Sequence, residues 1–227
     1  MKYKVLLFDA DETLFDFKKS ESIALEQAIS DFDIPYDPDH HLKIYEAINT
    51  AIWKEFEEGK ITQNTLKVER FKRLSQELDI DFDPHRFSER YMYHLAEASF
   101  LLEDTLTLLE KLHGKFELVI VTNGLAYVQN RRIGKSSIAE YFSNIVISEE
   151  VGVAKPNPEI FEHTLKLIGQ VDKSEVLMIG DSLTSDIKGG IDFGVDTCWY
   201  NPKRLDNTSQ VKPTYEINDL MSLMKII

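Results

Sequence analysis

The sequence predicts an α/β protein with a Rossmann-like parallel sheet as its core and a bundle of helices inserted after the first strand. From residue 101 onward, short hydrophobic runs alternate with helical patterns, which is typical of βαβ units. A strand pattern at residues 2–8 opens the chain, and four amphipathic helical patterns follow it with no strand between them. We therefore expect a core domain made of residues 1–15 and 101–227, and a helical domain made of residues 16–100.

The four helices of the insertion are indicated by apolar residues at helical spacing, beginning around residues 25–32. Their boundaries are marked by residues that cap, begin or stop helices: Asp37 with Pro38, Gly59, Thr62 and Pro84. We expect Trp53 and Phe56, on the second of these helices, to lie in the core of the bundle rather than on a surface that stacks against a base.

The remaining elements of the core follow from the alternation after residue 101. The expected strands are residues 116–121, 145–147, 176–179 and 197–200. The helices between them are expected near residues 106–112, 128–133, 138–142, 160–168 and 182–194. Residues 201–213 are polar and predict a loop, which a short helix near residues 220–224 follows.

Composition excludes several classes of function. A net charge of −13 argues against a nucleic-acid polymer as partner, because such binding depends on basic patches. A small phosphorylated ligand remains compatible, since local lysines and a metal ion can offset the overall charge. Cys198 is the single cysteine, which fits a reducing compartment and a buried structural thiol. No apolar run approaches the roughly 20 residues that cross a bilayer, and no leader pattern opens the sequence, so we expect a cytoplasmic protein without a membrane partner. The sequence leaves the oligomeric state open.

Four separated segments place polar residues at or near the ends of the expected strands. They are Asp9-Ala10-Asp11-Glu12-Thr13, Thr122-Asn123-Gly124, Lys155-Pro156, and Gly180-Asp181 with Asp186 beyond it. Open α/β sheets bind ligands at the carboxyl ends of their strands, so we expect these segments to meet. Together they predict a phosphoryl-transfer site.

Asp9 and Asp11 are the candidate catalytic carboxylates. Two nearby carboxylates repel and lose their protons as a coupled pair, which suits one to be a nucleophile and the other an acid and base. Attack of a carboxylate on phosphorus gives an aspartyl-phosphate. The alternative is a solvated turn after a strand, where aspartate and glutamate are common.

The next two segments carry groups suited to phosphate. The hydroxyl of Thr122 and the backbone N–H groups through Asn123 and Gly124 can hold phosphate oxygens, although such residues also simply end strands. Lys155 precedes a proline and so favours an extended backbone, from which its ammonium could neutralise a nucleophile and a phosphate. A surface lysine is the alternative for Lys155.

Asp181 and Asp186 complete the candidate metal site. Mg²⁺ favours one or two carboxylates together with substrate oxygens and water. Asp186 could reach back toward Lys155 or a metal-bound water, or could be an ordinary aspartate near a helix N-terminus. Because a surplus of carboxylates without a cation is costly, the cluster itself predicts a metal ion.

The ordered set of motifs resembles the haloacid dehalogenase (HAD) superfamily, and the helical insertion resembles that superfamily's first type of cap domain. The resemblance implies that Asp9 is the nucleophile and Asp11 the general acid and base, and that Thr122 and Lys155 hold the phosphoryl group. It also implies that Mg²⁺ binds Asp9, Asp181 and the backbone carbonyl of Asp11, with Asp186 in support.

Two details refine this resemblance. Dehalogenating members of the superfamily lack the second aspartate of the first motif, so the presence of Asp11 favours phosphate chemistry. Glu12 stands at a position where glycine is common in the superfamily. Residues 9–14, 53–62 and 147–157 are similar to the branch of pyrimidine 5′-nucleotidases that cleave noncanonical nucleoside monophosphates. A sugar phosphomutase, a sugar-phosphate phosphatase and a nonenzymatic binding protein on the same scaffold remain as alternatives.

Overall fold

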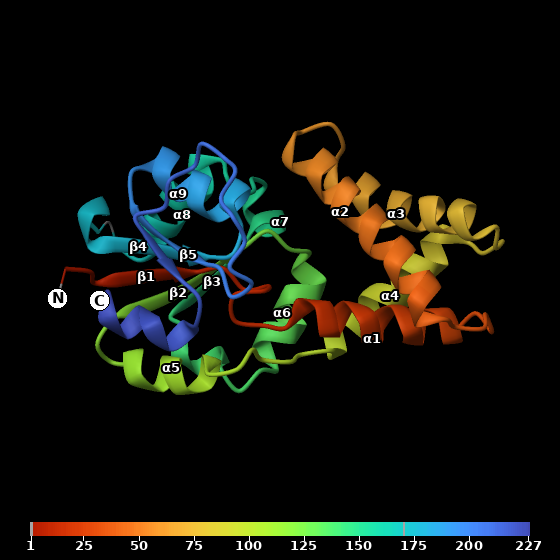
Figure 1. Ribbon diagram of the computed structural model, residues 1–227, viewed down its shortest axis with the longest axis horizontal. Coiled ribbons are helices and arrows are strands. Elements are labelled where there is room, and N and C mark those ends of the chain that lie inside the picture. Colours follow the sequence, from red (N-terminus) through yellow and green to blue (C-terminus); the bar gives the residue numbers. More distant parts are fainter. Residues whose placement is uncertain (1, 170) are drawn as a thin grey trace.

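The computed structural model describes residues 2–169 and 171–227, and within them six strands form one parallel sheet in the order β3-β2-β1-β4-β5-β6 (Figure 1). The strands are β1 (Val5–Phe8), β2 (Glu117–Thr122), β3 (Asn144–Ile147), β4 (Val176–Gly180), β5 (Asp196–Tyr200) and β6 (Tyr215–Ile217). The predicted α/β fold class with a parallel core is confirmed. The chain passes from β1 to β2 and β3 on one side, then returns to place β4 on the other side of β1, and such a switch point is where open α/β sheets bind ligands.

The side chains of β1 alternate between the two faces of the sheet, because successive residues of a strand point in opposite directions. Leu6 and Phe8 join the hydrophobic cluster that also contains Leu108 and Leu112 of α5. Val5 and Leu7 join the cluster on the other face, which contains Ile160 and other residues of α8. Burial on both faces explains why β1 appears in the sequence as an uninterrupted apolar run.

Helices cover both faces of the sheet. They are α5 (Thr105–Leu112), α6 (Ala126–Gly134), α7 (Ser148–Val151), α8 (Pro158–Leu167) and α9 (Lys188–Phe193). Short 3₁₀ and π-helical turns connect them or follow the last strand: Ala139–Tyr141, Lys173–Glu175, Leu183–Ile187 and Leu220–Lys225. Within the described residues, no helix is long and apolar enough to cross a membrane.

Four longer helices lie between β1 and β2 in the sequence and to one side of the sheet in space (Figure 1). They are α1 (Phe17–Ser30), α2 (Lys43–Glu57, preceded by a π-helical turn at Pro38–Leu42), α3 (Gln63–Leu78) and α4 (Pro84–Glu97). The side chains of Asp37, Thr62 and Asp83 cap the helices that follow them, as the polar residues before those helices predict. Leu125 and Val128, next to and within α6, join the hydrophobic core of these helices, so α6 is the element on which the insertion packs.

The structure adds elements that the sequence patterns did not predict. β6 has three residues and pairs with β5, and three residues are too few to give a period-two pattern. The four-residue helix α7 follows β3 directly, where a strand end was expected. The expected helices near residues 138–142 and 220–224 are 3₁₀ turns. Segments this short have too few residues for the sequence to distinguish a 3₁₀ turn from an α-helix.

Candidate active site

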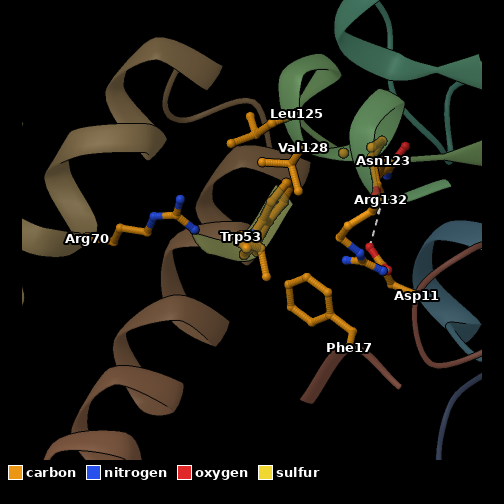
Figure 2. A pocket seen from close by; sticks show the side chains of 11 residues that line it. Asp11, Phe17, Trp53, Arg70, Asn123, Leu125, Val128 and Arg132 are labelled. Carbon is orange, nitrogen blue, oxygen red and sulfur yellow. Dashed lines mark hydrogen bonds and ion pairs between the residues drawn. The ribbon is translucent and has the colours of Figure 1, made fainter. Parts of the chain in front are cut away.

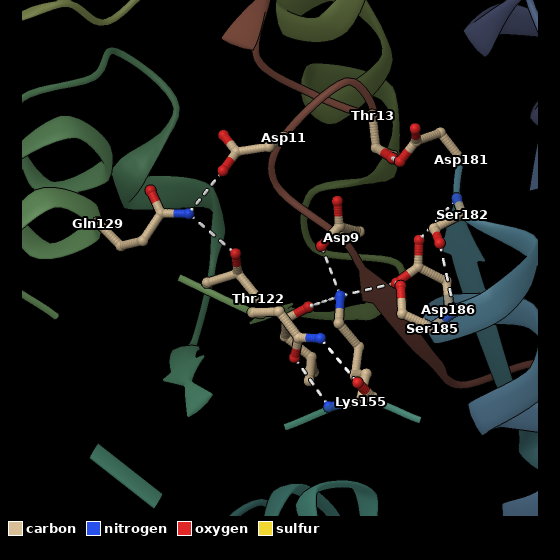
Figure 3. Close-up of polar contacts among 12 residues, drawn as sticks. Asp9, Asp11, Thr13, Thr122, Gln129, Lys155, Asp181, Ser182, Ser185 and Asp186 are labelled. Carbon is tan, nitrogen blue, oxygen red and sulfur yellow. Dashed lines mark hydrogen bonds and ion pairs between the residues drawn. The ribbon is translucent and has the colours of Figure 1, made fainter. Parts of the chain in front are cut away.

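Lys155 joins the ends of three strands at the switch point (Figure 3). Its Nζ donates to Asp9 Oδ1 at 2.5 Å and to the carbonyl oxygen of Val121 at 2.6 Å. The same Nζ lies 2.8 Å from Asp186 Oδ1. Lys155 is 1% exposed, so the alternative of a surface lysine is wrong. The position of Asp9 follows from its place directly after β1, where its backbone N–H donates to the carbonyl of Ile179 on β4.

The backbone of Lys155 is held by Asn123. Asn123 Nδ2 donates to the carbonyl oxygen of Lys155 at 2.8 Å, and the Lys155 N–H donates to Asn123 Oδ1 at the same distance. Both polar atoms of the Asn123 side chain are therefore used to position Lys155. The contact of Asn123 or Gly124 backbone N–H groups with a phosphate stays a prediction.

Asp9, Asp181 and Asp186 form a group of carboxylates with oxygens within 4.8 Å of one another. Burial, with the neighbouring Asp186 and Asp9 charges, raises the pKa of Asp181 to about 8. Burial likewise raises the pKa of Asp9 to about 7, although Lys155 acts in the opposite direction. Burial disfavours the charge of Lys155, but Asp186 and Asp9 outweigh it and hold the pKa of Lys155 above its ordinary value. One ammonium cannot balance three ionised carboxylates, so the cluster is fully charged only beside a further cation, and an all-oxygen donor set of this kind fits Mg²⁺.

Asp11 faces away from this cluster (Figure 3). Arg132 Nη2 donates to Asp11 Oδ1 at 2.5 Å, and Gln129 Nε2 donates to Asp11 Oδ2 at 2.9 Å. The Gln129 amide also donates to Thr122 Oγ1 at 2.9 Å, so it bridges two of the predicted residues. The two carboxylates of the first motif thus have different surroundings, and the side chain of Asp11 is not among the clustered metal candidates.

Gln129 and Arg132 are site residues that sequence reasoning missed. Both lie on α6, three positions apart, and therefore on one face of that helix. Both are buried, with exposed fractions of 1% and 0%. Polar residues among apolar ones on the buried face of a helix were the available signal, but helical periodicity alone assigns such residues to the surface.

Two backbone positions explain residue choices in the motifs. Glu12 has a φ of 60°, the left-handed region in which glycine is favoured, and its Oε1 accepts a hydrogen bond from the Lys18 N–H at 3.0 Å. Gly124 packs against Gln129, because a Cβ built at Gly124 would lie 2.4 Å from Gln129 Cγ. Glycine at this position therefore lets Gln129 reach Asp11 and Thr122.

A pocket lies between the helical insertion and the core, beside Asp11 (Figure 2). Trp53 of α2 and Phe17 of α1 line it together with Val128. The expectation that Trp53 and Phe56 belong to the bundle core is wrong, because both are half-buried and lie outside the hydrophobic cluster of the insertion. Their apolar spacing on α2 resembles a core pattern, but at this end of the helix Trp53 lines the pocket together with Val128 of α6.

Two polar contacts tie the insertion to the core near this pocket. Lys67 Nζ of α3 lies 2.5 Å from Glu149 Oε1, while the other oxygen of Glu149 accepts from the N–H of Ala126 at the start of α6 at 2.7 Å. Gln63 Nε2 donates to the carbonyl oxygen of Gly124 at 3.3 Å. α3 therefore closes over the same loop that carries the predicted phosphate-binding residues.

Comparison with known proteins agrees with this fold and site. Residues 3–194 match the family model of the haloacid dehalogenase-like hydrolases. Because the match spans most of the sequence, the chain belongs to the haloacid dehalogenase-like hydrolase family. The HAD-hydrolase YfnB of Bacillus subtilis is 38% identical over 226 residues, which cover 100% of this chain and 96% of that protein. Its magnesium-bound crystal structure superposes with a TM-score of 0.94, covering 100% of this chain and 99% of that one.

Two further relatives carry names that state an activity. The pyrimidine 5′-nucleotidase PynA of Streptococcus pneumoniae is 37% identical and covers 99% of this chain and 94% of that protein. The pyrimidine 5′-nucleotidase YjjG of Escherichia coli is 34% identical and covers 100% of this chain and 99% of that protein. The resemblance to the HAD superfamily and to its pyrimidine nucleotidase branch is confirmed.

Proposed function

We propose that this protein is a magnesium-dependent phosphomonoester hydrolase that forms an aspartyl-phosphate on Asp9, and that it acts as a 5′-nucleotidase on pyrimidine nucleoside monophosphates, noncanonical ones included. One observation carries the proposal: the two carboxylates of one motif occupy different environments. Asp9 is buried against Lys155, whereas Asp11 is held at the edge of the pocket by Arg132 and Gln129. Two carboxylates in different surroundings can take different roles. The one that lies beside Lys155 and the metal candidates is assigned as the nucleophile, and the one that faces the pocket as the acid and base.

The reaction would proceed in two displacements. Asp9 attacks phosphorus in line, the bond from phosphorus to the nucleoside oxygen breaks, and Asp11 gives its proton to that oxygen. Asp11, now a carboxylate, takes a proton from water as the water attacks the aspartyl-phosphate, which releases inorganic phosphate and regenerates Asp9. Thr122 and Lys155 would hold the oxygens of the phosphoryl group. Asp9, Asp181, Asp186 and the backbone carbonyl of Asp11 would hold Mg²⁺, whose charge lowers the repulsion between Asp9 and the phosphate.

In this proposal residues 16–100 act as a cap over a core domain made of residues 1–15 and 101–227. The pocket beside Asp11 supports this role, because residues of the insertion form one wall and residues of the core form the other. The structure of YfnB is described as revealing interdomain movement, and movement of the insertion here would admit a substrate and then exclude water. The leaving group would therefore be selected by the insertion.

The test is phosphate release from a panel of nucleoside monophosphates and sugar phosphates, with and without Mg²⁺, beside the Asp9→Asn variant. The expected result is magnesium-dependent release from pyrimidine nucleotides that falls at least about 10³-fold in Asp9→Asn. Release from sugar phosphates alone would replace the nucleotidase by a sugar-phosphate phosphatase. Isomerised sugar phosphate without free phosphate would indicate a mutase, and full activity of Asp9→Asn would contradict the nucleophile.

A further inference from the structure

A buried arginine in the helical insertion has hydrogen bonds left unmade. Arg70 of α3 is 2% exposed, and its Nη1 donates to Asn49 Oδ1 at 3.2 Å. Among the described residues, none accepts a hydrogen bond from Arg70 Nε or Nη2. A guanidinium does not lose its charge in a protein, and buried donors without acceptors are costly. Because Arg70 also lines the pocket between the insertion and the core, these donors point to an acceptor on a ligand bound there.

The orientation of Arg70 is fixed by its neighbours. Asn49, which accepts from Arg70, donates in turn to Glu21 Oε1 at 2.7 Å. The guanidinium carbon lies 4.8 Å from the centre of the Phe71 ring and 5.0 Å from that of Tyr91. With Nη1 bound to Asn49, the edge that carries Nε and Nη2 is left as a planar pair of donors. Figure 2 shows the guanidinium directed toward Trp53 and the pocket.

The rest of the pocket defines what such an acceptor is attached to. The indole ring of Trp53 and the ring of Phe17 provide flat apolar surface, and Val128 extends it from the core side. Asp11, the proposed proton donor to the leaving oxygen, lies at the opposite end from Arg70 (Figure 2). A ligand that fits both ends is planar with apolar faces. It carries hydrogen-bond acceptors on the edge that faces Arg70, and it is joined to the phosphate on the side that faces Asp11.

We propose that Arg70 donates hydrogen bonds to the ring carbonyl oxygen of the pyrimidine base while Trp53 stacks on the base, so that these two residues set the specificity of the reaction. This inference rests on the proposed nucleotidase function. Arginine has only donors, which selects an oxo group over an exocyclic amine at the position it contacts. The cavity measures about 30 Å³ in the present arrangement, about enough for one water, so a base enters as the insertion moves away from the core.

The experiment compares two substrates with and without a base that carries carbonyl oxygens, on the same sugar phosphate. Uridine 5′-monophosphate is measured beside an analogue in which a phenyl ring replaces uracil on the same ribose 5′-phosphate. The wild-type protein is expected to prefer the uridine nucleotide in kcat/KM by about 10- to 100-fold, because loss of the oxygens leaves the donors of Arg70 unpaired. Arg70→Met is expected to reduce this preference to less than about threefold. Arg73→Met removes an arginine on the same helix that pairs with Glu55 outside the pocket, and it should keep the full preference.

The outcomes separate this inference from the proposed function. An equal loss of kcat/KM for both substrates in Arg70→Met would mean that Arg70 only supports the fold, and would overturn the inference. If Arg70→Met does not fold, the comparison of the two substrates with the wild-type protein decides alone. Equal kcat/KM for the two substrates would overturn the inference, and a preference for uridine 5′-monophosphate would support it. Release of phosphate from sugar phosphates but from neither of these substrates would overturn the nucleotidase function, and the inference with it.

Discussion

Arg132 Nη2 lies 2.5 Å from Asp11 Oδ1, and the arginine that makes this contact is entirely buried while the carboxylate is partly exposed. The guanidinium of Arg132 also lies 5.3 Å from the ring centres of both Phe15 and Phe17, which restrict its movement. A buried donor thus positions a partly exposed carboxylate. Because Arg132 belongs to α6, on which the insertion packs, the position of the proposed general acid is linked to the element that supports the insertion.

The first prediction concerns Arg132 as a positioning residue. Arg132→Met should lower kcat by about 10- to 100-fold with KM changed less than about threefold, since Asp11 would be present but misplaced. Steady-state kinetics with a nucleotide substrate measures this split. Arg131→Met is the matched control, because Arg131 pairs with Glu97 at the surface. Equal kcat for the two variants would contradict the positioning role.

Asp11→Asn should affect substrates according to their leaving groups. Hydrolysis of a nucleotide should fall about 10²- to 10⁴-fold, because its alkoxide leaving group needs a proton. With p-nitrophenyl phosphate, whose leaving group needs none, a burst of nitrophenol equal to the enzyme concentration should precede slow turnover, because water is no longer activated. Rapid-quench or stopped-flow absorbance measures the burst. A proportional loss with both substrates and no burst would argue against an acid and base role for Asp11.

Magnesium should stabilise the folded protein through the carboxylate cluster. A ligand that binds only the folded state at 100 times its Kd adds about 2.7 kcal/mol to the free energy of unfolding, which thermal denaturation with and without Mg²⁺ detects. Asp181→Asn should remove most of this response. Without metal the same variant should be more stable than wild type, because burial has already raised the pKa of Asp181 to about 8 and its charge is unfavourable.

The control for the metal prediction is Asp192→Asn, since Asp192 pairs with Lys188 on the surface of α9 and is away from the cluster. It should respond to Mg²⁺ as the wild type does. A full stabilisation of Asp181→Asn by Mg²⁺ would show that the metal binds elsewhere.

Stability should also depend on the protonation of Glu21 inside the insertion. Burial raises the pKa of Glu21 from 4.5 to about 7, so the folded state favours the protonated form. The stabilising contribution is complete below about pH 4.5, is lost as the pH rises toward about 7, and is on the order of 3 kcal/mol across that range. Glu21→Gln keeps an oxygen for the Asn49 amide and should flatten this part of the profile. Denaturant unfolding measured between pH 5 and 8 gives the free energy of unfolding at each pH. If this free energy depends on pH in Glu21→Gln as it does in the wild type, the assignment to Glu21 is refuted.

The sequence alone determined the order of the core elements and the segments that meet at the switch point. Asp9 and Asp181 could be placed because each directly follows an apolar run, and the ends of adjacent parallel strands lie at one edge of the sheet. The helix boundaries of the insertion were readable for a similar reason. Thr62 and the residues before Pro38 and Pro84 cap helices through contacts with residues two or three positions away.

Only the tertiary structure decided how the site is completed. Asn123 bonds the backbone of Lys155 across 32 positions of sequence, and Arg132 reaches Asp11 across 121. Trp53 has the spacing of a core residue, yet it lines the pocket because of how the insertion docks on α6. Helical periodicity and capping record contacts within a few residues, whereas these contacts depend on the packing of whole elements, which no local pattern encodes.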